Sequence, residues 1–425
     1  MSAAAPAFLA PPTDDRPLSG VKVVEFGQFI AGPGATQTLA DLGADVVKIE
    51  SAHGDNGRHF GVSESTGWRS GLFLAYNRGK RSVVLDMRRP EGLAAARRIA
   101  LGADVVLQNV RAGVMESLGL DAHSLRTEKP ELIHVSISGF GTQGPSRTRP
   151  GLDIAAQAES GIMAITGERG GNPLKTGFPV ADASTAAFTA NAILAALLRR
   201  ARTGRGETIE TSLLASAIAM QAQILAEYQL TGRLPARNGN AQPLVAPAAD
   251  VIAVQDGYIV ISAYLQDHWR RLCQAIDRPQ LATDPRFADN NARVQNRAAL
   301  IGALQEALGG FCGAEAQSLL ERHQVVVGVV RDYAQVMASP DVQAMRLFQP
   351  VGDGAGGQVE LPGLPFSLAD AQATPGAPEV PPLGAHTGQV LQECGYGPAD
   401  IAQLLAAGAA GLPPAQAAAV QGAIR

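Results

Sequence analysis

An aspartate that follows a proline-bearing apolar segment is the first candidate for chemistry in this sequence. Asp182 stands in FPVADASTAAF, directly before an alanine-rich stretch with helical composition. Aspartate is a favoured N-cap residue, so Asp182 could serve only to begin that helix. The preceding apolar segment would also deliver Asp182 to the edge of a sheet, where the sites of α/β proteins gather. The residues alone leave both interpretations open.

Glycines after the first apolar run form a second candidate. Gly27, Gly32 and Gly34 could let a helix N-terminus hold a pyrophosphate, or they could form a plain strand-to-helix turn, since their spacing is not GxGxxG. Glu50 ends the next apolar run, where an acidic residue would either contact a ribose or lie in solvent. A basic cluster follows, typical of a phosphate-binding rim or of a solvated surface, and comprises Arg78, Lys80, Arg81, Arg88 and Arg89.

Composition and missing motifs exclude several classes of protein. The 35 Lys and Arg residues against 39 Asp and Glu give a net charge of −4, which does not fit a nucleic-acid binder. The sequence contains no GxSxG, HExxH or GxxxxGK[ST] motif, so a triad hydrolase, a zincin and a P-loop enzyme lose support. Three widely spaced cysteines indicate neither a disulfide framework nor a zinc site, and a cytoplasmic location is expected. Without a secretory signal or a run of about 18 apolar residues, the protein is expected to be soluble.

Short apolar runs alternate with helical stretches through the first half of the chain. The runs predict strands at 21–26, 44–50, 82–87, 104–109 and 132–138, with helices at 35–42 and from Pro90 onward. Strands that are apolar on both faces indicate a parallel sheet covered on two sides. With 425 residues, the chain has room for two or three domains of the α/β class.

Beyond Asp182 the pattern changes. Two long alanine-rich helices, at 183–202 and 213–230, are separated by a turn at TGRGE, and we expect them to leave the first domain. After a loop-rich stretch at 232–247, alternation around Asp256-Gly257 predicts a hairpin at 250–263. Helices at 267–276, 291–308 and 314–323 and an apolar run at 325–330 would complete a smaller domain. A second loop-rich passage at 352–382 precedes a last helical stretch from Thr387 onward.

Colinear motifs along nearly the whole chain resemble those of the family III CoA-transferases (CaiB/BaiF, formyl-CoA transferase-like). They include LSGVKVVEFGQFIAGPGATQTLADLGADVVKIE, NRGKRSVVLDMRRPEG, GADVVLQNVRAGVMESLGL, SISGFGTQGP, PVADAST, LLRRARTGRGETIETSLL, DGYIVISAYLQDHWRRLC and PPLGAHTGQVL. The resemblance implies a large Rossmann-like α/β domain with a mostly parallel sheet, a smaller α+β domain, long linkers and an interlocked homodimer. We therefore expect a CoA-binding domain at 1–212, a helical linker at 213–247, the small domain at 248–338, a return linker at 339–385 and, returning to the large domain, C-terminal helices at 386–425.

The resemblance also implies a reaction for Asp182. In such enzymes the carboxylate attacks an acyl-CoA, an aspartyl-CoA thioester forms, and a small carboxylic acid then accepts the CoA. Acyl-CoA and the acid are the expected partners, without nucleic acid, membrane, metal or a tightly bound cofactor. A helix N-terminus would keep the Asp182 carboxylate ionised.

Further site residues follow from the same resemblance. Gln28, near the thioester, and Asp153, near the nucleophile, join Asp182 as catalytic candidates, although Asp153 could equally cap its own helix. The expected CoA-binding positions are Ile30, Ala31, Leu85, Arg88, Asn109 and Arg111. Ile30 stands where some members carry a glutamine. Ser51 and Ser117 stand where some carry arginines, so that phosphate contacts would shift to Arg58, Arg81 or Arg88. The acceptor pocket would include the partner subunit and the loop 238–242.

Two alternatives remain from the sequence. A 2-methylacyl-CoA racemase of similar fold needs an acid and a base, but Leu152 and Leu265 stand at or near the two places, and neither can move a proton. A non-catalytic CoA-binding protein would retain the fold and lose the carboxylate, which Asp182 argues against.

Overall fold

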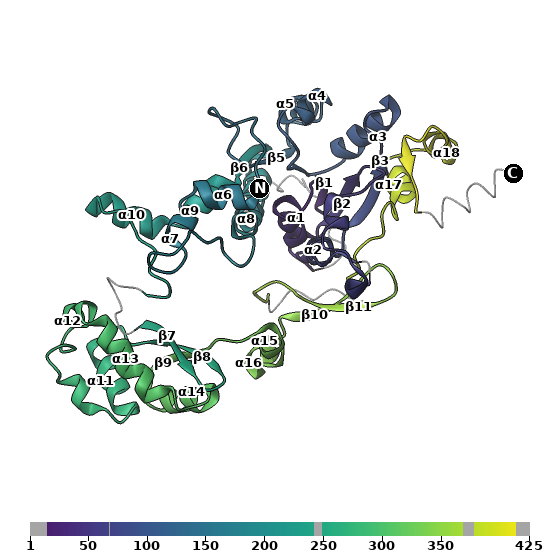
Figure 1. Ribbon diagram of the computed structural model, residues 1–425. Coiled ribbons are helices and arrows are strands. Elements are labelled where there is room, and N and C mark those ends of the chain that lie inside the picture. Colours follow the sequence, from purple (N-terminus) through teal and green to yellow (C-terminus); the bar gives the residue numbers. More distant parts are fainter. Residues whose placement is uncertain (1–14, 68, 242–248, 369–377, 414–425) are drawn as a thin grey trace, which may run out of the picture. The chain divides into compact units, whose positions relative to one another are not determined.

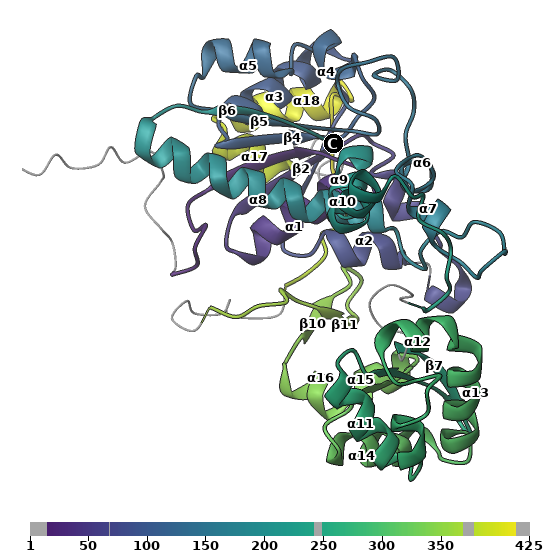
Figure 2. The same ribbon diagram turned by 90° about the vertical axis from the view of Figure 1, so that its left-hand side faces the viewer.

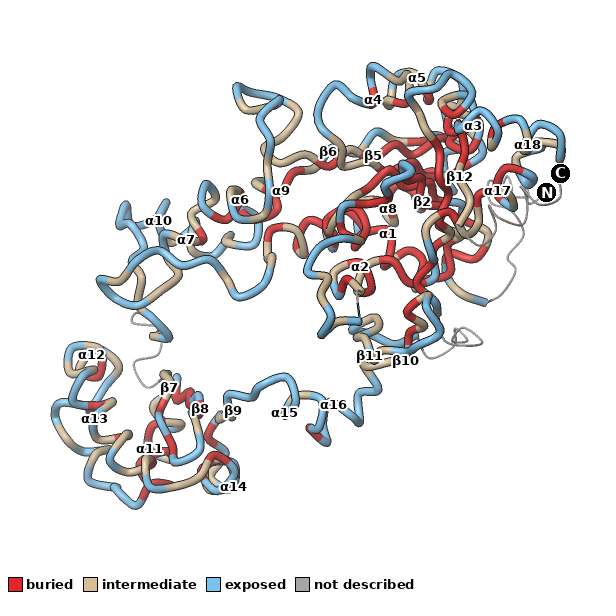
Figure 3. Tube along the Cα trace, turned by 45° about the vertical axis from the view of Figure 1, so that its right-hand side comes forward, coloured by how far each residue is buried: buried red, intermediate tan, exposed pale blue. Residues whose placement is uncertain are grey.

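The computed structural model describes residues 15–67, 69–241, 249–368 and 378–413 (Figure 1). These residues group into two compact units. The first contains residues up to 162, 176–226 and those from 346 onward, and the second contains 163–175 and 227–345. Each unit has its own buried core, and Figure 3 shows buried residues, in red, within each unit.

A mostly parallel sheet of seven strands forms the centre of the first unit, in the order β12-β3-β2-β1-β4-β5-β6. Its strands are β1 (Lys22–Phe26), β2 (Asp45–Glu50), β3 (Arg81–Leu85), β4 (Val105–Gln108), β5 (Ile133–Ser138), β6 (Glu207–Ser212) and β12 (Ala410–Gly411). Only β12 runs antiparallel to its neighbour, β3. The predicted α/β class with a mostly parallel sheet is thus confirmed, and the strand order reverses between β1 and β4.

Helices cover both faces of this sheet (Figure 2). One face carries α1 (Ala31–Asp41) and α8 (Val180–Thr203), whose small side chains Ala35 and Ala181 lie in the same buried cluster. The other face carries α3 (Pro90–Leu101), α5 (Ala122–Glu128), α17 (Thr387–Glu393) and α18 (Pro398–Ala406). Residues 387–411 therefore lie against strands from the first quarter of the chain.

Helix α8 packs into the first unit, so the expectation from the sequence pattern that it leaves this domain was wrong, whereas the domain bounds 1–212 drawn from the family resemblance include it. Its length and composition would suit a membrane span, but half of its most apolar window is buried inside the fold. Ala190 and Ile193 are at most 2% exposed and pack against the sheet, which accounts for that apolar character. Helix α8 packs against α1 and β5, and this packing keeps it in the first unit despite the change of sequence pattern after Asp182 and the turn at TGRGE.

Several elements differ from the sequence prediction. TGRGE leads directly into the strand β6, which was not expected, and the helix predicted at 213–230 is two helices, α9 (Leu213–Ala219) and α10 (Ala222–Thr231). The passage at 352–382 was expected to be loops but overlaps a hairpin of β10 (Phe348–Gly352) and β11 (Gln358–Pro362). Other short helices of this unit are η1 (Asn56–His59), η2 (Glu64–Thr66), α2 (Gly71–Tyr76), α4 (Val114–Ser117), α6 (Asp153–Glu159) and α7 (Ile162–Ile165), which ends in the second unit.

The second unit packs helices against a small antiparallel sheet of β7 (Ala249–Val254), β8 (Gly257–Ser262) and β9 (Val326–Val329). Val254 pairs with Gly257, which confirms the hairpin predicted at Asp256-Gly257. The buried core includes Trp269, Leu304 and Ile259. Its helices are η3 (Pro279–Ala282), α11 (Gln266–Ala275), α12 (Asn290–Gln295), α13 (Arg297–Leu308), α14 (Gly313–Arg322), α15 (Tyr333–Ala338) and α16 (Pro340–Ala344).

Candidate functional site

The turn between β1 and α1 lies where the strand order reverses. The backbone N–H of Gln28 donates to Asn109 Oδ1 at 2.8 Å, and Asn109 Nδ2 donates to the Gln28 carbonyl at 2.9 Å. Because Asn109 directly follows β4, this reciprocal pair joins the carboxyl ends of β1 and β4. Crevices at such reversal points are where open α/β sheets bind their ligands. Asn109, predicted to contact CoA, thus uses its side-chain amide to hold this turn.

Helices α1 and α8 bring Asp182 to the same place. Both helices run antiparallel to the parallel strands that they connect, so they are parallel to each other. They are very close, because a Cβ added to Gly34 would lie 3.0 Å from the Ala186 Cβ. Asp182 is one turn before Ala186, and Ile30 is one turn before Gly34. The nucleophile candidate and the β1–α1 turn therefore lie at the same end of the two helices.

Asp153 anchors the first turn of α8. The N-cap of α8 is Pro179, which offers no side-chain cap, and Asp182 is the third helical residue rather than the N-cap. Asp153 Oδ1 accepts from the backbone N–H of Ala181 at 2.8 Å and of Asp182 at 3.2 Å. Gln157 Nε2 donates to Asp153 Oδ2 at 2.6 Å. Asp153 is therefore a cap, but of α8 rather than of its own helix α6.

The carboxyl group of Asp182 is strongly perturbed. Burial, and then the negative charge of Asp153, raise the pKa of Asp182 from 3.8 to about 7. Among the described residues, none donates a hydrogen bond to this carboxyl group. The expectation that the helix N-terminus keeps it ionised was wrong in this respect, because Asp153 occupies the helix N–H groups and desolvation outweighs the helix dipole.

Tyr76, at the end of α2, is a residue of this site that sequence reasoning missed. A Cβ on Gly34 would lie 3.4 Å from the Tyr76 ring, so the ring faces the point where α1 meets α8. Burial, and then the charge of Asp182, raise the pKa of the Tyr76 hydroxyl. No local pattern marks Tyr76, since it stands in an apolar helix followed by the basic cluster.

The other predicted CoA-binding positions divide by exposure. Ile30, Ala31 and Leu85 are buried, at 7%, 2% and 1% exposed, so any contact with CoA would use their backbone. Arg88 and Arg111 are exposed on loops after β3 and β4, and Arg88 pairs with Asp86. All five positions lie at the carboxyl edge of the sheet, as predicted for a ligand site, and their role in binding stays a prediction.

Charged residues for which the sequence left a ligand contact or a solvated position open are buried instead. Glu50 is 5% exposed and accepts from Arg58 Nε and from Ser82, so it neither lies in solvent nor remains available to a ribose. Arg78 and Lys80 are also buried and pair with Asp41 and Glu25. Within the basic cluster, the solvated-surface interpretation fails for these two residues because each has an acidic partner inside the fold.

The arginines proposed as substitute phosphate ligands differ in availability. Arg58 forms a two-atom contact with Glu50, and Arg81 pairs with Asp45 and with Glu393. Arg88 has a side chain that is 90% exposed. Arg88 is therefore the best placed of the three to meet a phosphate.

The predicted acceptor loop lies in the second unit. Asn238 Oδ1 accepts from Arg169 at 3.3 Å, and Gly239 donates to the Gly167 carbonyl at 2.9 Å, so this loop packs on residues 167–169. Gln242 lies outside the described residues. Within the described part of the chain, no group of three or more His, Cys, Asp or Glu side chains could hold a metal ion.

The chain is similar to known proteins over most of its length. The family model described as CoA-transferase family III matches residues 18–387. The chain is 36% identical to the succinate–glutarate CoA-transferase of Agrobacterium fabrum, over 90% of this chain and 96% of that protein. It is 32% identical to the human succinyl-CoA:glutarate CoA-transferase, over 92% and 90%. A crystal structure of a CaiB/BaiF family protein from Brucella suis superposes with a TM-score of 0.81 at 38% identity, covering 89% of this chain and all of that one.

Proposed function

The chain belongs to CoA-transferase family III and is a CoA-transferase, and we propose that it moves CoA from an acyl-CoA to a carboxylic acid through a covalent thioester on Asp182. The observation that carries this proposal is the placement of Asp182. It is a carboxylate with no hydrogen-bond donor among the described residues, at the end of two parallel helices and beside the strand-order reversal.

Each proposed step forms one bond and breaks another, and none needs an outside acid or base. The ionised carboxylate of Asp182 attacks the thioester carbon, and the C–S bond breaks to give a mixed anhydride and CoA thiolate. The thiolate attacks the Asp182 carbonyl carbon, which releases the donor acid and leaves the aspartyl-CoA thioester. The acceptor carboxylate then attacks this thioester, and the same two steps in reverse release the new acyl-CoA and restore Asp182.

Gln28 and Asp153 have separate parts in this proposal. The Gln28 side-chain oxygen accepts from Asn56 Nδ2 at 2.7 Å, which leaves the Gln28 Nε2 hydrogens to donate to the oxygen of the reacting carbonyl. Asp153 holds the backbone of Asp182 and, by its charge, raises the energy of the ionised nucleophile. CoA thioesters are the substrates of this family, and no other cofactor takes part in the proposed steps.

The names of relatives suggest the substrate class. Those named above act on succinate and glutarate, and a relative from Haloarcula hispanica, 35% identical, is a succinyl-CoA:mesaconate CoA-transferase. We propose succinyl-CoA as donor and a second dicarboxylate as acceptor. A panel of acyl-CoA donors against mono- and dicarboxylic acids, read by mass spectrometry, tests this. Transfer restricted to monocarboxylic acids would contradict it.

An experiment in heavy water separates transfer from racemisation. A chiral 2-methylacyl-CoA should keep its α-hydrogen and its configuration, while a suitable acid is converted to its CoA ester. Racemisation needs groups that remove and return the α-proton, and Leu152 and Leu265 carry no titratable atom. Deuterium uptake at the α-carbon, measured by mass spectrometry and chiral chromatography, would instead support the racemase alternative.

We also propose that two copies of the chain interlock, as the family resemblance implies. Helix α10 has no buried residue among those described, although it is rich in apolar side chains. Exposed apolar residues on and beside α9 and α10 include Ile218, Met220, Leu225, Tyr228 and Leu230. A second copy that covers them would remove apolar surface from water.

Dilution should therefore leave a dimer. Because threaded chains separate only after partial unfolding, light scattering should report the dimer down to the lowest measurable concentration. Added denaturant should remove the dimer and the far-UV circular dichroism together. A folded monomer at low concentration would show that the chains are not interlocked.

A further inference from the structure

The β1–α1 turn contains a backbone conformation that needs support. Phe29 has φ of +61°, in the left-handed region that residues with a side chain rarely adopt. Strained backbone of this kind persists only where the surroundings hold it, and it gathers at functional sites. Phe29 follows Gln28 directly, so its conformation sets the direction in which the chain enters α1.

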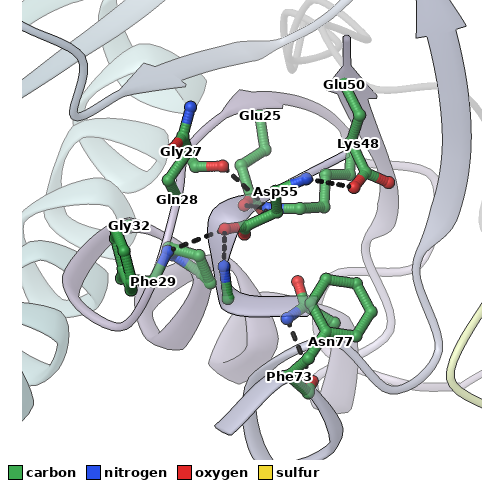
Figure 4. A network of polar contacts seen from close by, with 12 residues as sticks. Glu25, Gly27, Gln28, Phe29, Gly32, Lys48, Glu50, Asp55, Phe73 and Asn77 are labelled. Atoms are coloured by element: carbon green, nitrogen blue, oxygen red, sulfur yellow. Dashed lines mark hydrogen bonds and ion pairs between the residues drawn. The ribbon is translucent and has the colours of Figure 1, made fainter. Parts of the chain in front are cut away.

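Asp55 and Lys48 hold this turn through contacts with Phe29 and Gly27 (Figure 4). Asp55 Oδ1 accepts from the backbone N–H of Phe29 at 3.2 Å and from that of Gly57 at 2.7 Å. Lys48 Nζ lies 2.9 Å from Asp55 Oδ2 and donates to the Gly27 carbonyl at 2.8 Å. One ion pair thus contacts the turn at both ends, on either side of Gln28.

This ion pair belongs to a buried network of balanced charge. Three acids and three bases form it, namely Glu25, Glu50, Asp55, Lys48, Lys80 and Arg58. The Glu50–Arg58 pair joins the others because Glu50 Oε2 accepts from the backbone N–H of Asp55 at 2.9 Å. Burial alone would raise the pKa of Glu25, but Lys48 and Lys80 lower it to about 2. Replacing buried ion pairs with apolar residues is often neutral or stabilising, so stability alone is a weak reason for such a network.

The same network also orients the Gln28 side chain. Asn56 directly follows Asp55, and its Nδ2 donates to Gln28 Oε1 at 2.7 Å. Asp55 is only 2% exposed and accepts two backbone N–H groups, so it ties the loop that carries Asn56 to the β1–α1 turn. Asp55 therefore supports the turn alongside Asn109, and it also supports the loop whose Asn56 contacts the Gln28 side chain.

We propose that Asp55 is a positioning residue for CoA transfer: it holds the Gly27–Phe29 turn in the conformation that presents Gln28 at the Asp182 end of α1 and α8. This role rests on the proposed function of Asp182. Asp55 does not touch the reacting atoms, and its effect passes through the Phe29 backbone.

The test measures how Asp55 and Phe29 depend on each other. At saturating succinyl-CoA, Asp55→Ala should slow formation of the Asp182 adduct about tenfold, with a smaller change in the KM for succinyl-CoA, because the strained turn relaxes. In a Phe29→Gly background the same change should slow it about threefold or less, since glycine adopts a positive φ without cost. In the matched Phe29→Ala background the loss should stay about tenfold, because alanine keeps the Cβ penalty. Equal losses in all three backgrounds would overturn the proposal.

A conservative variant and a second readout guard against a folding artefact. Asp55→Asn keeps an oxygen that accepts from the Phe29 N–H, but it removes the carboxylate charge that pairs with Lys48. It should therefore lower the melting temperature while slowing adduct formation about threefold at most. Hydrogen exchange in peptides covering 27–31 should speed up in Asp55→Ala and return toward the wild-type rate in Asp55→Asn. Unchanged exchange in Asp55→Ala would overturn the positioning role. A wild-type protein that forms no adduct refutes the proposed function instead, and the exchange measurement still decides the role of Asp55.

Discussion

Replacing Asp182 by alanine should abolish CoA transfer, by about 10⁴-fold or more, while binding of CoA persists. In the proposed mechanism this carboxylate becomes acylated and then carries CoA, whereas the predicted CoA-binding positions lie on other strands and loops and at the start of α1, at the same sheet edge. Transfer assays with succinyl-CoA and calorimetric titration with CoA measure the two effects separately. Substantial transfer by the purified variant would refute the assignment of Asp182.

The wild-type protein supplies the complementary result. Incubated with an acyl-CoA and no acceptor, it should carry a CoA adduct on Asp182 that hydroxylamine removes. Asp182→Asn, which keeps the size of the side chain, is the matched control and should carry none. Cys273 is the thiol to monitor as a competing site of modification. It is fully buried, and burial raises its pKa to about 12, so we expect no adduct there. An adduct mapped to Cys273 would contradict the mechanism.

The central sheet was predictable because its strands are short apolar runs with clear ends. The run at 21–26 corresponds to β1 (Lys22–Phe26), and the run at 132–138 corresponds to β5 (Ile133–Ser138). Hydrophobic runs identify strands buried on both faces, and most residues of these two strands are buried. The edge strand β6 was not predicted because its sequence, ETIETS, contains a single apolar residue and follows two glycines.

The sequence motif suggested Asp182 as the proposed nucleophile, but it did not indicate the environment of this side chain. Asp153 lies 29 residues before Asp182, and nothing in the local sequence shows that its carboxylate caps the helix of Asp182. Lys48 is a similar case. A lysine near the end of an apolar strand looks solvated, yet Lys48 is fully buried, where it pairs with Glu25 of β1 and with Asp55 of the loop after β2. Pairings between charges depend on tertiary contacts that periodicity does not encode.

Asp182 also predicts how activity depends on pH. Its pKa is raised to about 7, first by burial and then by Asp153, and only the ionised form attacks a thioester. The kcat/KM for acyl-CoA should therefore be level above pH 7 and fall about tenfold per pH unit below it. Asp153→Asn removes the like charge but not the burial, so it should move the midpoint part of the way toward lower pH. A midpoint near pH 4 in the wild-type protein would contradict the raised pKa.

The same raised pKa affects the stability of the fold, but in the opposite direction: stability decreases over the pH range in which activity increases. Because the pKa of Asp182 is raised in the folded protein, the unfolded chain gives up the Asp182 proton at a lower pH than the folded protein does. The contribution of Asp182 to stability therefore falls as the pH rises from 3.8 to about 7, and it stays low above that. Asp182→Asn removes this cost and should raise the melting temperature at pH 8 but leave it nearly unchanged at pH 4. Equal shifts at both pH values, in parallel thermal melts, would show that burial of the ionised carboxylate carries no cost in the folded protein.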